Sequence, residues 1–250
     1  AVLGGDGCGI ELPAARHPLL VLDGVAVVPS DLEVRPGAAL VVSGPNAGGK
    51  TVALKTLGLA ALMARAGLFA PAGPGARIAA FAVVLTDVGD DQSLVRNLST
   101  FSAHVQNLSA ILARAGGRAL VLLDELAGGT DPREGEALAT SVLEALCARG
   151  ATVACTTHYE QLKTLALVDD RFRNASVGFD LATMRPTFRL ALGIPGASSA
   201  LAVARRFGID AAVIARAEQL MGPELGTVSQ LVERLARERC ALADERDELK

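Results

Sequence analysis

The sequence predicts an α/β fold in which a central, mostly parallel sheet is flanked by helices. Short, largely apolar segments of strand length recur along the chain, as is typical of strands buried inside a parallel sheet. These segments are residues 39–43, 119–125 and 151–158. Segments with helical spacing alternate with them, at residues 50–67, 100–117 and 134–150. This alternation indicates βαβ units, because neighbouring parallel strands need a crossover connection.

The remaining segments give the expected domain organisation. We expect residues 1–35 to form short lead-in strands and turns that pack on a core domain of residues 36–222. Within that core, residues 77–88 have the composition of a strand and residues 174–193 the pattern of a hairpin. Two helical stretches, 198–207 and 210–221, follow.

Residues 223–250 differ in composition from the rest. Apolar residues recur every seven positions in this charged segment, at Val228, Leu235, Leu242 and Leu249. This spacing predicts the start of a truncated coiled coil, but Glu238 and Glu245 occupy positions where a coiled coil would place apolar residues. A solvated terminal helix is therefore the alternative. Because the pattern stops midway at Lys250, we expect the chain to be part of a longer protein.

The amino-acid composition argues against several classes of protein. Half of the 250 residues are hydrophobic, the formal net charge is −3 and aromatic residues make up 3%. A strongly basic nucleic-acid module and a base-stacking surface for single strands are therefore disfavoured. The four cysteines lack CxxC spacing, which favours a cytoplasmic protein without a disulfide framework. No signal peptide and no long uncharged apolar run is present, so we expect no membrane partner.

The segment between the first core strand and its helix predicts a phosphate-binding loop. It matches the pattern G-x-x-x-x-G-K-[ST] and has the strand before and the helix after that this pattern requires. Glycines allow backbone N–H groups to turn toward phosphate oxygens, and the helix N-terminus adds partial positive charge. The residues are Gly44, Pro45, Asn46, Ala47, Gly48, Gly49, Lys50 and Thr51. Lys50 supplies a charge to the phosphates, and the Thr51 hydroxyl is a candidate ligand for Mg²⁺.

Two carboxylates end the strand 119–125 and complete a candidate hydrolytic site. We expect Asp124 to hold Mg²⁺ through water and Glu125 to orient and deprotonate the attacking water, the latter a role worth roughly 10²–10⁴ in rate. No Asn-Lys-x-Asp segment that would recognise guanine is present, so the expected nucleotide is ATP.

His158 follows a further strand, which we expect beside the strand that ends in Asp124. There it could contact the γ-phosphate and position water. A lone histidine at a strand end is also commonly structural, and that alternative stays open. His104 and His17 have weaker claims to the site.

Six segments in this order resemble the ATPase of MutS proteins, a branch of the ABC superfamily, and within it the bacterial MutS-two proteins. They are GPNAGGKTVALKTLGL, GDDQSLVRNLSTFSAHVQNLSAIL, LLDELAGGTDPREGEALA, TTHYEQLK, NASVGFD and RPTFRLALGIPGASSALAVARRFGI. The resemblance covers roughly residues 15–222 and implies a P-loop NTPase fold of ABC/MutS type. It also implies that two copies sandwich two nucleotides, so that the chain would form a homodimer through its ATPase faces.

The resemblance implies further site residues. The segment that completes the partner's site matches Ser99, Thr100, Phe101 and Ser102, which would also suit an ordinary helix start, and Asp131 matches the loop at the dimer axis. A coupling linker matches Asp87, Asp90 and Gln92. Adenine is expected near Val27 and Val28, where no aromatic residue is available in the sequence to stack on it. The family pattern Asp-Glu-Leu-Gly-Ala-Gly-Thr is altered here to Ala127-Gly128-Gly129, which could change a turn that needs positive φ.

Several functions share these motifs. The leading expectation is an ATPase motor whose cycle performs work on nucleic acid, through branched DNA and suppression of recombination or through collided ribosomes. The resemblance places those contacts, and any nuclease activity, mainly in parts outside this chain. A nucleotide-gated dimerisation clamp with incidental hydrolysis and the ATPase of a mismatch-repair MutS are the alternatives. A transporter subunit is disfavoured because Leu-Ser-Gly-Gly-Gln is absent.

Overall fold

The structure is a computed structural model that describes residues 2–4, 8–45, 48–89, 100–180, 183, 185–196 and 200–220. Its centre is a six-stranded sheet in which five neighbouring strands are parallel and one edge strand is antiparallel. The strand order is β10 (Arg185–Leu192), β9 (Phe172–Asp180), β4 (Ala39–Ser43), β8 (Thr152–Thr156), β7 (Ala119–Leu123) and β6 (Val83–Asp87). The predicted α/β class and its mostly parallel sheet are confirmed.

Three of the inner strands explain why the sequence pattern indicated a parallel sheet so clearly. Every residue of β4, β7 and β8 is buried, because helices cover both faces of this part of the sheet. The hairpin expected at residues 174–193 is also present, as the antiparallel pair β9 and β10 at one edge.

A second, four-stranded sheet has the order β1 (Val2–Gly4), β5 (Arg77–Ala79), β2 (Ile10–Ala15) and β3 (Ser30–Val34). The lead-in thus supplies three of its strands, and β5 comes from the segment expected to be a single strand at 77–88. That expectation was wrong, because the chain leaves the small sheet after Ala79 and enters the large sheet at Val83. Phe81, which is 4% exposed, anchors the crossing in the core. The apolar residues between the two strands hide this break in the sequence pattern.

The lead-in also contains a short helix, α1 (Pro18–Leu22), where only strands and turns were expected. Proline opens this helix and His17 caps it, since the Leu20 N–H donates to His17 Nδ1 at 3.4 Å. Burial of the imidazole, together with the nearby charge of Lys55, lowers the pKa of His17. His17 therefore has a structural role in this lead-in.

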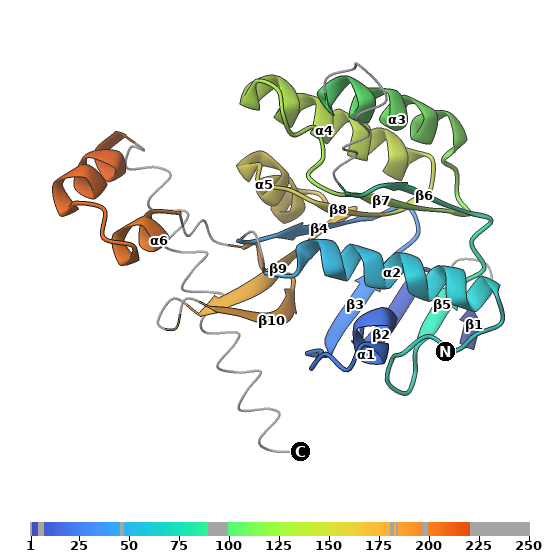
Figure 1. Cartoon of the computed structure of the whole chain (residues 1–250). Helices are drawn as coiled ribbons and strands as arrows, with labels where there is room; N and C mark the ends of the chain where they lie inside the picture. The colour runs from blue at the N-terminus through green and yellow to red at the C-terminus, as the bar shows by residue number, and fades with distance from the viewer. Residues whose placement is uncertain are drawn as a thin grey trace.

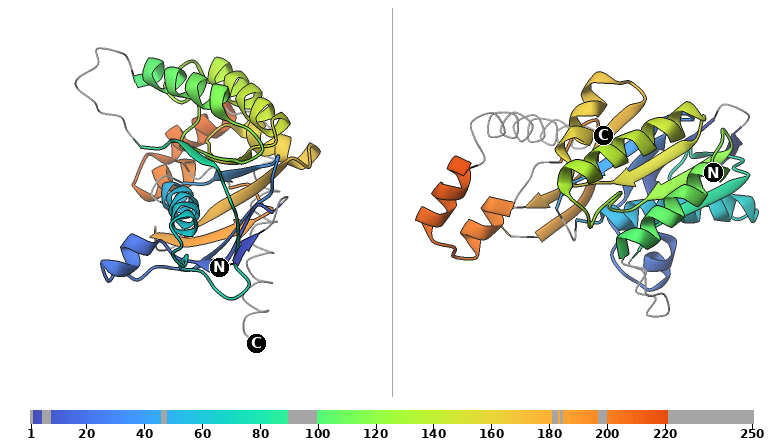
Figure 2. Two further views of the ribbon diagram at one scale, coloured as in Figure 1. Left: turned by 90° about the vertical axis from the view of Figure 1, so that its right-hand side faces the viewer. Right: turned by 90° about the horizontal axis from the view of Figure 1, so that it is seen from above.

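The helices form layers on the two faces of the large sheet (Figure 1). On one face α2 (Lys50–Arg65) lies between the large and the small sheet, and its Leu54 and Leu57 are fully buried there. The other face is covered by α3 (Thr100–Arg114), α4 (Pro132–Ala148) and α5 (Glu160–Val168). The perpendicular views show the same layers (Figure 2).

Helix α6 (Ala200–Arg206) and the helical residues 211–220 stand to one side of these layers (Figures 1 and 2). Among the described residues, no helix is both long enough and apolar enough to cross a lipid bilayer. The predicted coiled coil at 223–250 lies outside the described residues.

Because β4, β7 and β8 are parallel, their carboxyl ends meet at one edge of the large sheet. The phosphate loop, the acidic pair and His158 follow these three strands. The fold therefore gathers the predicted site residues at the edge where open α/β sheets bind ligands.

Candidate active site

The phosphate loop connects β4 to α2, and its backbone needs glycine at both ends. Gly44 has a φ of 126° and Gly49, the N-cap of α2, a φ of 98°, which are conformations that side chains with a Cβ rarely adopt. Lys50 folds back over the loop, and its Nζ donates to the Gly44 carbonyl oxygen at 2.7 Å. Asn46 and Ala47, also predicted for this loop, lie outside the described residues.

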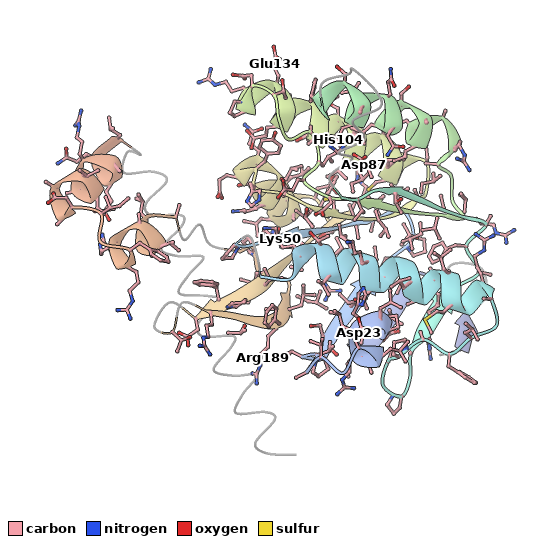
Figure 3. The ribbon with its side chains drawn as sticks, in the orientation of Figure 1. Asp23, Lys50, Asp87, His104, Glu134 and Arg189 are labelled. Atoms are coloured by element: carbon pink, nitrogen blue, oxygen red, sulfur yellow. The ribbon has the colours of Figure 1, made fainter. Side chains whose placement is uncertain are left out.

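Lys50 lies at the N-terminal end of α2 (Figure 3). The residue is buried, with 5% of its surface exposed. Burial lowers the pKa of its ammonium group, while the nearby carboxylates of Glu125 and Asp124 act in the opposite direction. A buried cation facing two carboxylates suits a site that receives a polyanion together with a metal ion.

Two segments that come later in the sequence, the neighbouring strand β9 and the residues after β10, pack behind the phosphate loop. A Cβ added at Gly48 would lie 2.6 Å from Val177 Cγ2, and one at Gly196 would lie 2.6 Å from the Gly44 nitrogen. The Gly196 N–H also donates to the Ser43 hydroxyl at 2.7 Å. Sequence reasoning gave Gly196 no role, because its contact with the loop exists only in the tertiary structure.

Asp124 sits at the end of β7 between two threonine hydroxyls. Thr51 Oγ1 donates to its Oδ2 at 2.8 Å, and Thr156 Oγ1 donates to its Oδ1 at 2.5 Å. Two ligands at right angles on one Mg²⁺ stand about 3 Å apart, since each lies about 2.1 Å from the ion. The spacing of Thr51 Oγ1 and Asp124 Oδ2 would therefore allow both to bind one Mg²⁺ directly, whereas the sequence predicted that Asp124 holds it through water.

Glu125 and His158 face each other across the ends of β7 and β8. Glu125 Oε1 and His158 Nε2 are 3.5 Å apart, and both side chains are about half exposed. The Glu125 N–H donates to Thr156 Oγ1 at 2.8 Å, so the same threonine holds both acidic residues. The structure thus brings together the two predicted catalytic residues, with their functional atoms open to solvent.

An apolar pocket of about 160 Å³ lies beside the loop. The predicted adenine contacts Val27 and Val28 line it, together with Gly48 and Gly49. The lead-in itself offers no aromatic residue, but Phe188 of β10 also lines this pocket. Phe188 is half-exposed, with a φ of 55°, at the irregularity in the pairing of β10 with β9. It is remote in sequence from the lead-in, so only the folded chain places it there.

A cluster on the other side of the acidic pair joins β6 to α3. Asp87 Oδ2 and His104 Nδ1 are 2.9 Å apart, and Asn107 Nδ2 donates to Asp87 Oδ1 at 2.8 Å. Figure 3 shows His104 and Asp87 next to each other. The Asp124 N–H donates to the Asp87 carbonyl oxygen at 2.8 Å, so this cluster connects directly to the acidic pair. The sequence did not predict the contact of His104 with Asp87, because it depends on how α3 packs against β6.

The residues expected to act across a dimer are described in part. Asp131 caps α4, since its Oδ1 accepts from the N–H groups of Arg133 and Glu134 at 2.9 and 3.2 Å. Phe101 and Ser102 lie half-buried in the first turn of α3, which begins at Thr100. Three residues of these predicted groups lie outside the described residues: Asp90, Gln92 and Ser99.

The segment between β7 and α4, residues 124–131, begins with the acidic pair and is called the acidic loop. Its altered glycine pattern has a structural consequence. Ala127, where the family pattern has glycine, takes a φ of 57°. Gly129 is also left-handed at 85°, whereas Gly128 is not among the residues with positive φ. The turn therefore keeps a left-handed residue at position 127, but with an alanine that adopts this conformation at some cost.

The chain is similar to known proteins over most of its length. The family model described as "MutS domain V" matches residues 40–223. The chain is 50% identical over 237 residues to a protein named Endonuclease MutS2 from Symbiobacterium thermophilum, an alignment that covers 94% of this chain and 30% of that protein. It is 51% identical over 229 residues to Endonuclease MutS2 from Thermomicrobium roseum, covering 91% of this chain and 29% of that protein.

A third relative, Endonuclease MutS2 from Anaeromyxobacter sp., is 49% identical over 242 residues, which cover 96% of this chain and 30% of the relative. The chain thus spans about 30% of the length of these curated relatives. The family match covers most of the chain and includes the phosphate loop, the acidic pair and His158. The chain therefore belongs to the MutS family, and residues 40–223 correspond to domain V, its ATPase domain.

Proposed function

We propose that the chain binds ATP across the phosphate loop and the adjacent apolar pocket, and hydrolyses it to ADP and phosphate. The observation that carries this proposal is the direct contact of Thr51 and Asp124, which come from the loop and from the neighbouring strand end. A glycine-rich loop between a strand and a helix would by itself suit many ligands. A hydroxyl and a carboxylate at metal-ligand spacing beside it suit a nucleotide bound with a divalent cation.

Each end of the nucleotide has a suitable environment. The triphosphate would lie against the loop, where Lys50 and the N-terminus of α2 supply positive charge. Adenine would enter the pocket lined by Val27 and Val28, with the Phe188 ring offering a stacking surface. Mg²⁺, when bound by Thr51 and Asp124, would neutralise charge on the phosphate oxygens.

Glu125 is the proposed general base. A water molecule between Glu125 and the γ-phosphate would transfer its proton to the carboxylate as its oxygen attacks phosphorus, and the bond to the β-phosphate oxygen would break. His158, 3.5 Å from Glu125, would orient this water or contact the γ-phosphate. Because both side chains are half-exposed, a ligand can approach them from solvent.

That exposure also supports a site completed by a second copy of the chain. In this proposal the first turn of α3, with Thr100, Phe101 and Ser102, approaches the γ-phosphate bound by the partner. Ser99, which precedes this helix in the sequence, would act with them, and Asp131 would lie near the dimer axis. Helix N-termini favour negative charge, so the start of α3 suits this task. The ATPase would then be active as a dimer closed by ATP.

Work on nucleic acid is the proposed purpose of this cycle, because the similar proteins are named endonucleases. These proteins are about three times as long as this chain, so the contacts with nucleic acid would lie mainly in their other parts. Branched DNA and collided ribosomes are the candidate targets. In the alternative, a nucleotide-gated clamp, ATP binding closes the dimer and hydrolysis is incidental. The half-exposed Glu125–His158 pair favours the hydrolytic proposal, because binding alone needs no general base.

The test compares two lysines in one helix. Lys50→Ala removes the buried cation, and Lys55→Ala, on an exposed position of α2, is the matched control. We expect ATP affinity, measured by calorimetric titration with Mg²⁺ present, to fall at least tenfold for Lys50→Ala and to stay within twofold for Lys55→Ala. Equal affinity of Lys50→Ala and the unmodified chain would refute the phosphate-loop assignment.

A further inference from the structure

Tyr159 connects the two catalytic segments. It directly follows His158 and forms the N-cap of α5, and its hydroxyl donates to the Ala127 carbonyl oxygen at 2.8 Å. Ala127 lies two residues after Glu125 in the loop that leaves β7. One side chain thus joins the segment that carries the candidate base to the segment that carries its histidine partner.

The loop needs such a contact because its backbone is strained. Glu125 and Ala127 both adopt left-handed conformations, with φ of 45° and 57°, although neither is glycine. Such conformations persist only where the surroundings hold them in place. The Thr156 hydroxyl holds the start of this loop through the Glu125 N–H, and the Gly128 N–H donates to the Glu125 carbonyl oxygen at 2.9 Å. Tyr159 holds the loop at Ala127.

Helix α4 leaves space for this contact at a glycine. A Cβ added at Gly135 would lie 2.2 Å from the Tyr159 hydroxyl oxygen and 2.8 Å from the Ala127 carbonyl oxygen. Any other residue at this position would push the two groups apart. The hydrogen bond therefore depends on three elements that meet at one point: the acidic loop, α4 and the start of α5.

We propose that Tyr159 is a positioning residue for hydrolysis, which fixes the Glu125 carboxylate relative to the His158 imidazole by holding the Ala127 carbonyl. This inference rests on the proposed ATPase function. Tyr159 itself touches neither nucleotide nor water in this role. Partial burial, with the nearby charges of Glu136 and Asp131, raises the pKa of the Tyr159 phenol and keeps it protonated as a donor.

The composition of the chain makes this residue directly observable. The sequence contains one tyrosine and no tryptophan, so ultraviolet absorbance of the phenolate reports Tyr159 alone. We expect the phenol, read within seconds of a pH jump, to titrate above the ordinary value of about 10. In Gly135→Ala, where the hydroxyl is displaced, the titration should shift toward that ordinary value. A phenol that titrates at the ordinary value in the unmodified chain would overturn the inference.

The kinetic test removes only the hydroxyl. We expect Tyr159→Phe to lower kcat by about tenfold, since small errors in the alignment of a base are costly, while ATP affinity stays within twofold. Thr164→Val is the control, because this hydroxyl, in the same helix, donates to the Glu160 carbonyl oxygen at 3.1 Å and should not affect kcat.

The outcomes separate the two proposals. Turnover of Tyr159→Phe within twofold of an active unmodified chain would overturn the positioning role and leave the ATPase proposal intact. If the unmodified chain neither binds nor hydrolyses ATP, the ATPase proposal fails, and the role of Tyr159 in hydrolysis fails with it.

Discussion

Thr156 offers a quantitative test of how the acidic pair is held. Its side chain is fully buried at the end of β8, where the hydroxyl donates to Asp124 and accepts from the Glu125 N–H. Thr156→Val nearly preserves the volume and shape of the side chain and removes both hydrogen bonds. The substitution therefore isolates the contribution of the hydroxyl from the contribution of packing.

The expected cost follows from the two bonds. A hydrogen bond to a charged carboxylate contributes about 1.5–3 kcal/mol and one between neutral groups about 0.5–1.5 kcal/mol. Asp124 is only partly buried, so water can replace part of the first contribution. We therefore expect Thr156→Val to lower the free energy of unfolding by about 2 kcal/mol, at the lower end of the combined range.

Urea unfolding followed by circular dichroism measures this loss. Thr140→Val is the matched control, because the Thr140 hydroxyl donates only to the Glu136 carbonyl oxygen of its own helix, at 2.8 Å. The control should stay within about 0.5 kcal/mol of the unmodified chain. If Thr156→Val unfolds at the same urea concentration as the control, the hydroxyl does not hold the acidic pair and the geometry described for this site is wrong.

Three further predictions concern other parts of the structure. Gly48→Ala should weaken ATP binding at least tenfold, because its Cβ would lie 2.6 Å from Val177 Cγ2. Adding Val177→Ala should restore part of the affinity, and no recovery in the double variant would show that this clash is not the cause of the loss. Burial raises the pKa of the thiols of Cys147 and Cys155 to about 11 and about 12, so a thiol reagent at pH 8 should label at most two of the four cysteines until urea is added. The same shifts predict that stability is complete below about pH 9 and falls as pH rises toward these values, since only the unfolded chain then ionises its thiols. His104→Ala should lower the free energy of unfolding, measured with urea, by about 1–2 kcal/mol, because the Asp87 carboxylate at the end of β6 loses one of its partners. An unchanged urea midpoint would contradict this.

The parts of the fold that the sequence predicted well are those where burial or backbone geometry restricts the choice of residues. The strand at 39–43 was predicted with its observed bounds because burial on both faces requires an unbroken apolar run. The phosphate loop was recognisable because Gly44 and Gly49 take conformations that favour glycine. The residues proposed for phosphate and metal binding lie on these restricted elements.

Contacts between distant segments were not predictable in the same way. Phe188 reaches the apolar pocket beside the phosphate loop from an irregular edge strand, and Gly135 accommodates the Tyr159 hydroxyl from another helix. Neither position carries a local signal, since an exposed aromatic residue and a helical glycine are both common. The strand expected at 77–88 divides between two sheets because its connecting residues are as apolar as the strands themselves.

The central claim is that ATP closes two copies of the chain around the half-exposed Glu125 and His158. The most direct test is the mass in solution of Glu125→Ala, measured by light scattering at several concentrations with and without Mg-ATP, since this variant should bind ATP and hydrolyse it slowly. The account predicts a monomer without nucleotide and a doubled mass with ATP. A variant that is saturated with ATP and remains a monomer at every concentration would contradict it.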